Sequence, residues 1–307
     1  MVVWRGVLIH TTSESLNFSK SCLNMEALVD TMDWVSPCLT SGLGNRLFQH
    51  AAAAGAAEQW GRPLRFLAGR CTESPHGPLA TVFRMFPNVP LIESDERYTE
   101  IKEGPRGYYM HVPVPREPPA GPVLIHGFRQ SPLYFPKDLS TLKPDWDNAL
   151  GGPIVRRMIE KEGGLDTEEE RLRTVSIHVR LGDYLKLPHH QANLGPYYQQ
   201  ALQRVKPGMR LYVFSDEPDR CSNLFAGYCS SKGIRYTVAK VRSDVESLYE
   251  MSLCRGGNIV ANSTFSWWAA WFAHQAGSPW ATYPSNWGQG MPEPANLFPE
   301  WGTVLQV

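Results

Sequence analysis

Short apolar runs alternate with helix-favouring stretches through the second half of this chain, and this alternation constrains the fold more than any other feature. Strands that alternate with helices form a parallel sheet covered by helices on both faces. We expect strands at Val175–Val179, Leu211–Phe214, Arg235–Val238 and Asn258–Ala261, and helices at Tyr197–Val205, Pro218–Lys232 and Asp244–Cys254. The sequence therefore predicts an α/β domain in this half.

The first half has the same order of strand and helix, with longer irregular segments between the elements. Trp34–Leu39 is a plausible short strand, a turn with two glycines follows it, and an alanine-rich stretch typical of a helix runs from Arg46 to Trp60. Further strands are expected at Pro63–Leu67 and Val123–Phe128. This half therefore predicts a second unit built from strands and helices.

The length of the chain sets the expected number of domains. A chain of 307 residues is longer than one compact core usually is, so we expect two domains. The segment 104–122 is so rich in proline and glycine that we expect a loop, and a helix at Ile154–Glu162 ends at a glycine pair. We predict an N-terminal extension at 1–33, a Rossmann-like domain at 34–160 and a second one at 161–307.

Composition argues against several classes of protein. Basic and acidic residues number 30 each, which argues against a broad nucleic-acid or membrane surface. No apolar run approaches the ~20 residues that cross a bilayer, and the first residues lack the features of a secretory signal. The six cysteines form no Cys-x-x-Cys pair, so neither a zinc site nor a disulfide framework is indicated. We expect a soluble, cytoplasmic protein with reduced thiols and no bound metal.

The stretch from His178 to Tyr184 carries a histidine, an arginine, a glycine and a carboxylate directly behind an expected strand. Arg180 keeps its charge and presents a fork of donors that suits a diphosphate, while Gly182 permits a sharp turn beside a ligand. Strand ends are where α/β enzymes place their chemistry. We therefore expect a phosphorylated substrate here; the alternative is a surface ion pair between Arg180 and Asp183.

The glycine loop at 41–45 precedes the first long helix. Backbone N–H groups near Gly42, Gly44 and Asn45, together with the positive end of the helix dipole, can point at an anion. The loop is not a dinucleotide fingerprint, because the third glycine is missing. A glycine-rich turn that binds no ligand is the alternative.

Two further polar segments follow expected strands. Asp216 comes after Ser215 and is expected to cap the next helix; a metal is not expected, since nothing nearby completes a set of oxygen ligands. The hydroxyl groups of the segment 262–266 can either cap the helix that follows or hold phosphate. The tryptophans after it are expected to be core packing rather than a sugar platform; they are Trp267, Trp268 and Trp271.

Three motifs in this order resemble those of the α-1,2-fucosyltransferases, glycosyltransferase family 11. They are Ser41–Gln49, His178–Tyr184 and Asn262–Trp271. Weaker matches lie between them, at Gly127–Phe135, Tyr197–Tyr198, Phe214–Pro218 and Met251–Cys254. The resemblance covers residues 38 to 288.

This resemblance implies a GT-B architecture, in which two Rossmann-like βα domains face each other across a cleft. It also implies inverting transfer of L-fucose from GDP-fucose to a glycan hydroxyl, O2 of a galactose-like unit, with no metal and no cofactor. The catalytic residues by similarity are His178, Arg180 and Asp183. Substrate-binding residues by similarity are Gly42, Gly44, Asn45, Arg46, Ser215, Asp216, Asp244, Glu246, Asn262, Ser263, Thr264, Phe265 and Ser266. Animal relatives carry a membrane anchor, so a bacterial-like, algal or virus-encoded protein is expected.

The chain departs from the family pattern at three places. The second of two consecutive arginines is Leu181 here, which predicts one cation fewer in the site or its supporting shell. A glycine and a glutamine of the family are Ser41 and Arg46, and Arg46 could return some of the missing charge. An acidic residue expected to read guanine is Ser247, for which Asp244 or Glu246 could substitute.

The base that deprotonates the acceptor hydroxyl is left open. The arginine beside Asp183 weakens it as a base, whereas His189 or His190 titrates in the right range. Two alternatives remain for the whole protein. One is a transferase of the same fold that uses another GDP-sugar, and the other is a catalytically silent protein that binds a glycan or a nucleotide.

Overall fold

The computed structural model describes residues 33–71, 77–104, 109–289 and 293–307. Its larger sheet has six parallel strands in the order β11-β10-β9-β6-β7-β8. They are β6 (Thr174–Val179), β7 (Arg210–Ser215), β8 (Arg235–Val238), β9 (Gly257–Ile259), β10 (Ala281–Pro284) and β11 (Thr303–Leu305). The strands predicted for this half are β6 to β9, and the two later ones extend one edge. In-register pairing of β6 with β7 brings Val179 opposite Ser215, so both strands end at the same edge.

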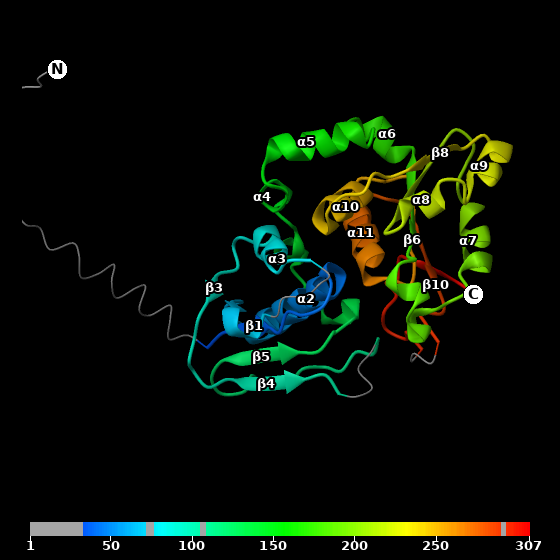
Figure 1. Cartoon of the computed structure of the whole chain (residues 1–307). Helices are drawn as coiled ribbons and strands as arrows, with labels where there is room; N and C mark the ends of the chain where they lie inside the picture. The colour runs from blue at the N-terminus through cyan, green and yellow to red at the C-terminus, as the bar shows by residue number, and fades with distance from the viewer. Residues whose placement is uncertain (1–32, 72–76, 105–108, 290–292) are drawn as a thin grey trace, which may run out of the picture.

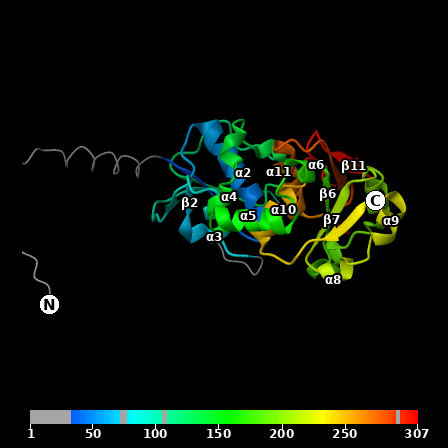
Figure 2. The same ribbon diagram turned by 90° about the horizontal axis from the view of Figure 1, so that it is seen from above.

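Helices cover both faces of this sheet (Figures 1 and 2). On one face the apolar side chains of β6 and β7, such as Val175 and Val213, pack against α7 (Gly195–Leu202), α8 (Pro218–Cys221) and α9 (Ala226–Lys232). On the other face Tyr212 and Phe214 pack against α10 (Asp244–Ser252) and α11 (Thr264–Gln275). The doubly covered parallel sheet predicted for this half is confirmed.

The single helix expected at Pro218–Lys232 is wrong, because α8 and α9 are separate. The backbone carbonyl of Cys221 accepts a hydrogen bond from the Tyr236 hydroxyl instead of a helical bond from Phe225. A turn therefore separates the two helices. Burial of Cys221 and Cys229, both fully enclosed, still keeps both helices on the sheet.

The N-terminal half contains two smaller parallel sheets. One has the order β1-β5-β4, formed by β1 (Val35–Pro37), β5 (Val123–His126) and β4 (Thr99–Lys102), and the other pairs β2 (Phe66–Leu67) with β3 (Leu91–Ile92). Helices of this half and of the connection are α2 (Leu43–Trp60), α3 (Ala80–Met85), α4 (Trp146–Leu150), α5 (Pro153–Glu162) and α6 (Glu168–Leu172).

The two halves confirm the predicted α/β class, with a parallel-sheet unit in each half. The described part of segment 104–122 is free of helix and strand before β5, as its prolines predict. The division at residue 160 falls inside α5 and stays a prediction, and residues 1–32 of the expected extension lie outside the described residues. No helix in the described part of the chain is long and apolar enough to cross a membrane.

Aromatic packing joins the two halves. Phe48 of α2 lies 4.7 Å from Trp267 and 5.2 Å from Trp268 of α11, measured between ring centroids. Both tryptophans are fully buried and Trp271 is nearly so, which confirms that they belong to the core. Such aromatic pairs bury a large apolar area and hold a defined geometry. They place α2 and α11 against each other, and this contact sets the position of the site.

Candidate functional site

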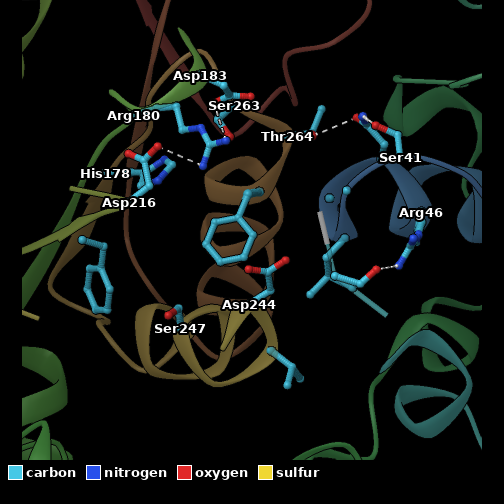
Figure 3. A pocket seen from close by; sticks show the side chains of 18 of the residues that line it. Ser41, Arg46, His178, Arg180, Asp183, Asp216, Asp244, Ser247, Ser263 and Thr264 are labelled. Carbon is cyan, nitrogen blue, oxygen red and sulfur yellow. Dashed lines mark hydrogen bonds and ion pairs between the residues drawn. The ribbon is translucent and has the colours of Figure 1, made fainter. Parts of the chain in front are cut away.

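A cavity of about 950 Å³ lies between the two halves. Its walls come from the ends of β6 and β7, the loop between β8 and α10, and the first turns of α2 and α11. Figure 3 shows Ser41 and Arg46 on one side of it and His178, Arg180 and Asp216 on the other. The cleft predicted between the domains is therefore present, at the carboxyl ends of the strands.

Arg180 lies at the end of β6 between two carboxylates. Its guanidinium nitrogens are 2.6 Å from Oδ1 of Asp183 and 3.3 Å from Oδ2 of Asp216, and it packs over the ring of Tyr184. The side chain stays about a quarter exposed to the cavity. The ion pair proposed as the alternative exists, but it lies in the cavity wall rather than on an open surface. Two aspartates therefore hold the arginine fork in place.

Asp216 does not cap α8, so that expectation is wrong. Its Oδ1 accepts a hydrogen bond of 2.9 Å from the backbone N–H of Leu181, and the N–H of Glu217 is bonded by Ser215 Oγ instead. A Cβ atom on Gly182 would lie 2.4 Å from Asp216 Oδ2. A larger residue at 182 would therefore displace the Asp216 carboxylate from its present position.

His178 lines the cavity from within β6 and is only 5% exposed. Burial, and then the nearby positive charge of Arg180, lower the pKa of His178 to about 3. Its Nδ1 has no hydrogen-bond partner among the described residues. The imidazole is therefore neutral at physiological pH and can exchange hydrogen bonds with a ligand without adding charge.

The first turns of α2 and α11 meet at the cavity. Neither helix has a side chain bonded to its N-terminal N–H groups at the N-cap, which is Gly42 in α2 and Ser263 in α11. A Cβ atom on Gly44 would lie 2.5 Å from the backbone nitrogen of Phe265. Two positive helix ends therefore converge, and helix N-termini of this kind bind phosphate.

Asn45 connects the two halves at this point. Its Oδ1 accepts hydrogen bonds from Thr264 Oγ1 at 2.9 Å and from Gln130 Nε2 at 2.7 Å, and its Nδ2 donates to Ser41 Oγ at 3.0 Å. Figure 3 shows Thr264 and Ser41 facing each other across this bridge. The Thr264 hydroxyl therefore serves the interface between the halves rather than capping α11.

Most of the residues predicted for the site line the cavity. They are Gly42, Gly44, Asn45, Arg46, His178, Arg180, Asp183, Ser215, Asp216, Asp244, Asn262, Ser263, Thr264 and Phe265. Arg46 is 1% exposed and donates to the carbonyl of Gly77 at 2.8 Å, and Asn262 donates to the carbonyls of His190 and Trp287. These two side chains hold neighbouring loops as well as facing the cavity.

Two predicted residues do not line the cavity and are corrected. The Glu246 carboxylate accepts from the N–H and hydroxyl of Ser243, which completes a capping box at the start of α10. The Ser266 hydroxyl is buried, donates to Ser263 O and accepts from Ala261 N. Of the two substitutes considered for an acidic residue at 247, Asp244 faces the cavity with Ser247 (Figure 3).

Leu181 also lies outside the cavity wall. Its side chain packs against the apolar cluster on the outer face of the sheet, which includes Val179 and Tyr197. Of the two places considered for the missing cation, the side chain at 181 therefore belongs to the residues that support the site and not to the cavity wall. Leu181 follows the end of β6, and its side chain packs on the same cluster as Val179.

Sequence reasoning missed several lining residues. Arg242 precedes α10 and is bonded to Glu250 and Glu162 at 3.0 Å each. His190, a candidate base, lines the cavity and stacks on Tyr184 at 4.4 Å; the side chain of His189 lies outside the described residues. The remaining missed residues that matter below are Tyr109, Phe128, Gln130 and Trp287. The weak motif Gly127–Phe135 was the signal that could have found two of them.

The described residues contain no group of three or more histidine, cysteine, aspartate or glutamate side chains placed to hold a metal ion. The cavity wall offers a ligand the arginine fork, the neutral histidine, hydroxyls and backbone N–H groups, with further basic side chains such as Lys240. Together they suit an anion with several oxygens.

Comparison with known proteins gives one family. The sequence profile of Glycosyl transferase family 11 matches residues 149–304. Two Escherichia coli proteins are similar: an O-antigen biosynthesis glycosyltransferase, WbnK, 34% identical over 33% of this chain and 35% of its own length, and an alpha-1,2-colitosyltransferase, 28% identical over 52% and 57%. The chain thus spans about a third of the length of WbnK and just over half of the length of the colitosyltransferase.

Solved structures with some likeness to the chain include the fucosyltransferase NodZ from Bradyrhizobium. It is 17% identical with a TM-score of 0.43, over 78% of this chain and 92% of that chain. POFUT1 in complex with GDP is 14% identical with a TM-score of 0.41, over 80% and 96%.

Proposed function

The chain belongs to glycosyltransferase family 11, and we propose that it transfers L-fucose from GDP-fucose to a hydroxyl of a glycan, O2 of a galactose-like unit, with inversion and without a metal. The observation that carries this proposal is the meeting of two uncapped helix N-termini in the cavity that also holds Arg180. Departure of GDP places negative charge on the diphosphate. Preorganised N–H groups and a guanidinium stabilise such charge.

Each catalytic residue has a distinct role in this proposal. Arg180 meets the diphosphate oxygens, and the carboxylates of Asp183 and Asp216 fix its orientation at 2.6 and 3.3 Å. His178, whose pKa is lowered to about 3, offers a neutral hydrogen-bonding nitrogen to the donor and does not act as a cation. The acceptor base stays open between Asp183 and His190, both of which line the cavity.

Ligand binding and turnover test the proposal together. The melting temperature is measured with GDP, UDP and ADP; saturation at ~100 times the Kd raises the free energy of unfolding by about 2.7 kcal/mol. Transfer from GDP-fucose to lactose is then followed with and without EDTA, and NMR of the product gives the anomeric configuration. If UDP raises the melting temperature and GDP does not, the assignment of GDP-fucose as donor is wrong. If EDTA abolishes transfer, the reaction requires a metal. Binding without turnover across an acceptor panel favours a silent binding protein.

A second candidate is transfer of a different GDP-linked sugar. The relative named as an alpha-1,2-colitosyltransferase supports it, since that protein matches just over half of this chain. Competition between GDP-fucose and other GDP-sugars in the same transfer assay separates the two. Both relatives come from Escherichia coli, which supports the bacterial-like source, while a cytoplasmic location stays a prediction.

A further inference from the structure

Backbone strain gathers on one wall of the cavity. Three non-glycine residues of the described chain have left-handed backbone: Ser41 with φ of 67°, Tyr109 with 61° and Arg129 with 52°. Ser41 and Tyr109 line the cavity, and Arg129 lies between two lining residues, Phe128 and Gln130. All three belong to the N-terminal half. Such strain persists only where surrounding structure holds it, and it clusters at binding sites.

A carboxylate holds the strained loop Gly127–Gln130 in this shape. Glu103 accepts hydrogen bonds from the N–H groups of Phe128 at 2.7 Å and Arg129 at 2.9 Å. The loop lies so close to this side chain that a Cβ atom on Gly127, whose φ is 117°, would be 2.3 Å from Glu103 Cβ. The backbone is therefore fixed directly on both sides of Phe128.

The Arg129 side chain ties this loop to the second strained segment. Its guanidinium is 1% exposed and donates to the carbonyls of Ile101 at 3.0 Å and Val112 at 3.4 Å. Val112 follows Tyr109, whose ring makes an edge contact with Trp287 at 5.8 Å. The loop and the segment from Tyr109 to Val112 therefore form one braced surface.

Three aromatic residues line the cavity near this surface, and we call Tyr109, Phe128 and Trp287 the aromatic wall. Tyr109 and Trp287 are 6% and 3% exposed and hold each other in place by their edge contact, whereas Phe128 is only half-buried. The neighbouring Gln130 donates to Asn45 at 2.7 Å, which ties this surface to the helix ends that face the diphosphate. A sugar on Phe128 would therefore lie beside the donor site.

We propose that the aromatic wall, with Phe128 as its contact ring, binds the acceptor through the apolar face of a β-galactoside. This inference rests on the proposed function. The axial hydroxyl of galactose leaves one face of the ring with only C–H groups, and such a face packs on an aromatic ring. Aromatic side chains on a rigid base lose little conformational freedom on contact. The wall holds no exposed charge of its own, which suits a neutral sugar.

Phe128→Ala tests this inference, with lactose as acceptor and GDP-fucose as donor. We expect the KM for lactose to rise at least about tenfold while the Kd for GDP changes less than about twofold. Phe128→Tyr keeps the ring and should restore the KM. Leu133→Ala is the matched control, because Leu133 is 58% exposed in the same segment and outside the cavity lining. Circular dichroism melting confirms that each variant folds.

Each other outcome overturns a separate statement. An unchanged KM for lactose in Phe128→Ala overturns the aromatic wall as acceptor site while the fucosyl transfer proposal stands. If the Kd for GDP in Phe128→Ala rises as much as the KM for lactose, the Phe128 ring contacts the nucleotide. This result also overturns the aromatic wall as acceptor site. A wild-type enzyme that binds GDP and hydrolyses GDP-fucose, yet transfers to no galactoside, overturns the acceptor class. A wild-type enzyme that binds no GDP overturns the proposed function itself.

Discussion

The two walls of the cavity hold their functional groups in different ways. On the C-terminal wall, regular strands β6 and β7 end together, and charged side chains such as Arg180 and Asp216 bond one another across them. On the N-terminal wall, strained loops carry the site, and their shape depends on braces such as Glu103. Charged side chains therefore dominate the first wall, and backbone shape dominates the second. Variants on each wall should therefore fail in different ways.

Arg180→Ala should have the largest effect. The variant loses the guanidinium that we propose to face the leaving diphosphate, and it leaves Asp183 and Asp216 without their cation. We expect kcat/KM to fall by at least about 10³-fold, since one preorganised donor alone contributes 10²–10³. Arg180→Lys keeps the positive charge but not the forked guanidinium, so its kcat/KM should lie between those of the wild type and Arg180→Ala. Steady-state kinetics measures this, with the exposed Arg220→Ala as control; activity near wild type in Arg180→Ala would remove the diphosphate role.

Gly44→Ala should damage the backbone of the site rather than its charge. The added Cβ would lie 2.5 Å from Phe265 N and push α2 away from α11. We expect the free energy of unfolding to fall by about 1–3 kcal/mol, as overpacked sites do, and GDP to bind more weakly. Urea denaturation and calorimetry measure both.

Gly69→Ala is the matched control for this variant, because no atom lies within 4 Å of its added Cβ. It should leave stability unchanged or slightly raised. If Gly44→Ala and Gly69→Ala have the same unfolding free energy and bind GDP equally well, the positions of the two helix ends do not depend on this close contact.

Acid should destabilise the protein through His178. The folded pKa of about 3 lies below the unfolded value near 6.5, so between these values only the unfolded state takes up the proton. Stability is therefore lost as the pH falls below about 6.5, by about 2 kcal/mol per such histidine at pH 5. His50 in α2, with its pKa lowered to about 4 by burial, acts in the same direction.

The variants His178→Gln and His50→Gln separate these contributions. Each should flatten the decline of the unfolding free energy between pH 7 and pH 5, measured by urea denaturation. Only His178→Gln should also weaken GDP binding, since His50 does not line the cavity. A decline as steep as in the wild type would mean that the histidine is protonated in the folded protein.

Leu181→Arg should have the smallest effect on the donor. The side chain at 181 packs against the outer apolar cluster and not in the cavity, so the new cation cannot restore a second diphosphate contact from that direction. We expect the Kd for GDP to stay within about twofold of wild type, with a small loss of stability from the lost packing. If Leu181→Arg binds GDP more tightly while Leu181→Met binds it as the wild type does, the side chain at 181 must reach the cavity.

The C-terminal wall could be predicted from sequence because its signals are local. The run from Thr174 to Val179 has the pattern of a buried strand, and the polar residues that follow it must emerge at the strand end. The N-terminal wall depends on bonds between distant residues, such as Glu103 with the loop at Phe128. No periodic pattern in the sequence indicates that the backbone of Arg129 is left-handed. The segments before β10 and β11 have too little hydrophobic pattern to predict these strands. The direction of Leu181 also required the structure.

The contact between Gly44 and Phe265 brings two positive helix ends together where the two halves meet. Each helix N-terminus carries roughly half a positive charge, and here two of them lie together without a capping carboxylate in either first turn. Like partial charges at this distance repel each other, so the two ends favour an anion between them. In the proposed function a bound diphosphate would be the counterion of both helix ends, so that we expect ligand binding to strengthen the contact between the two halves.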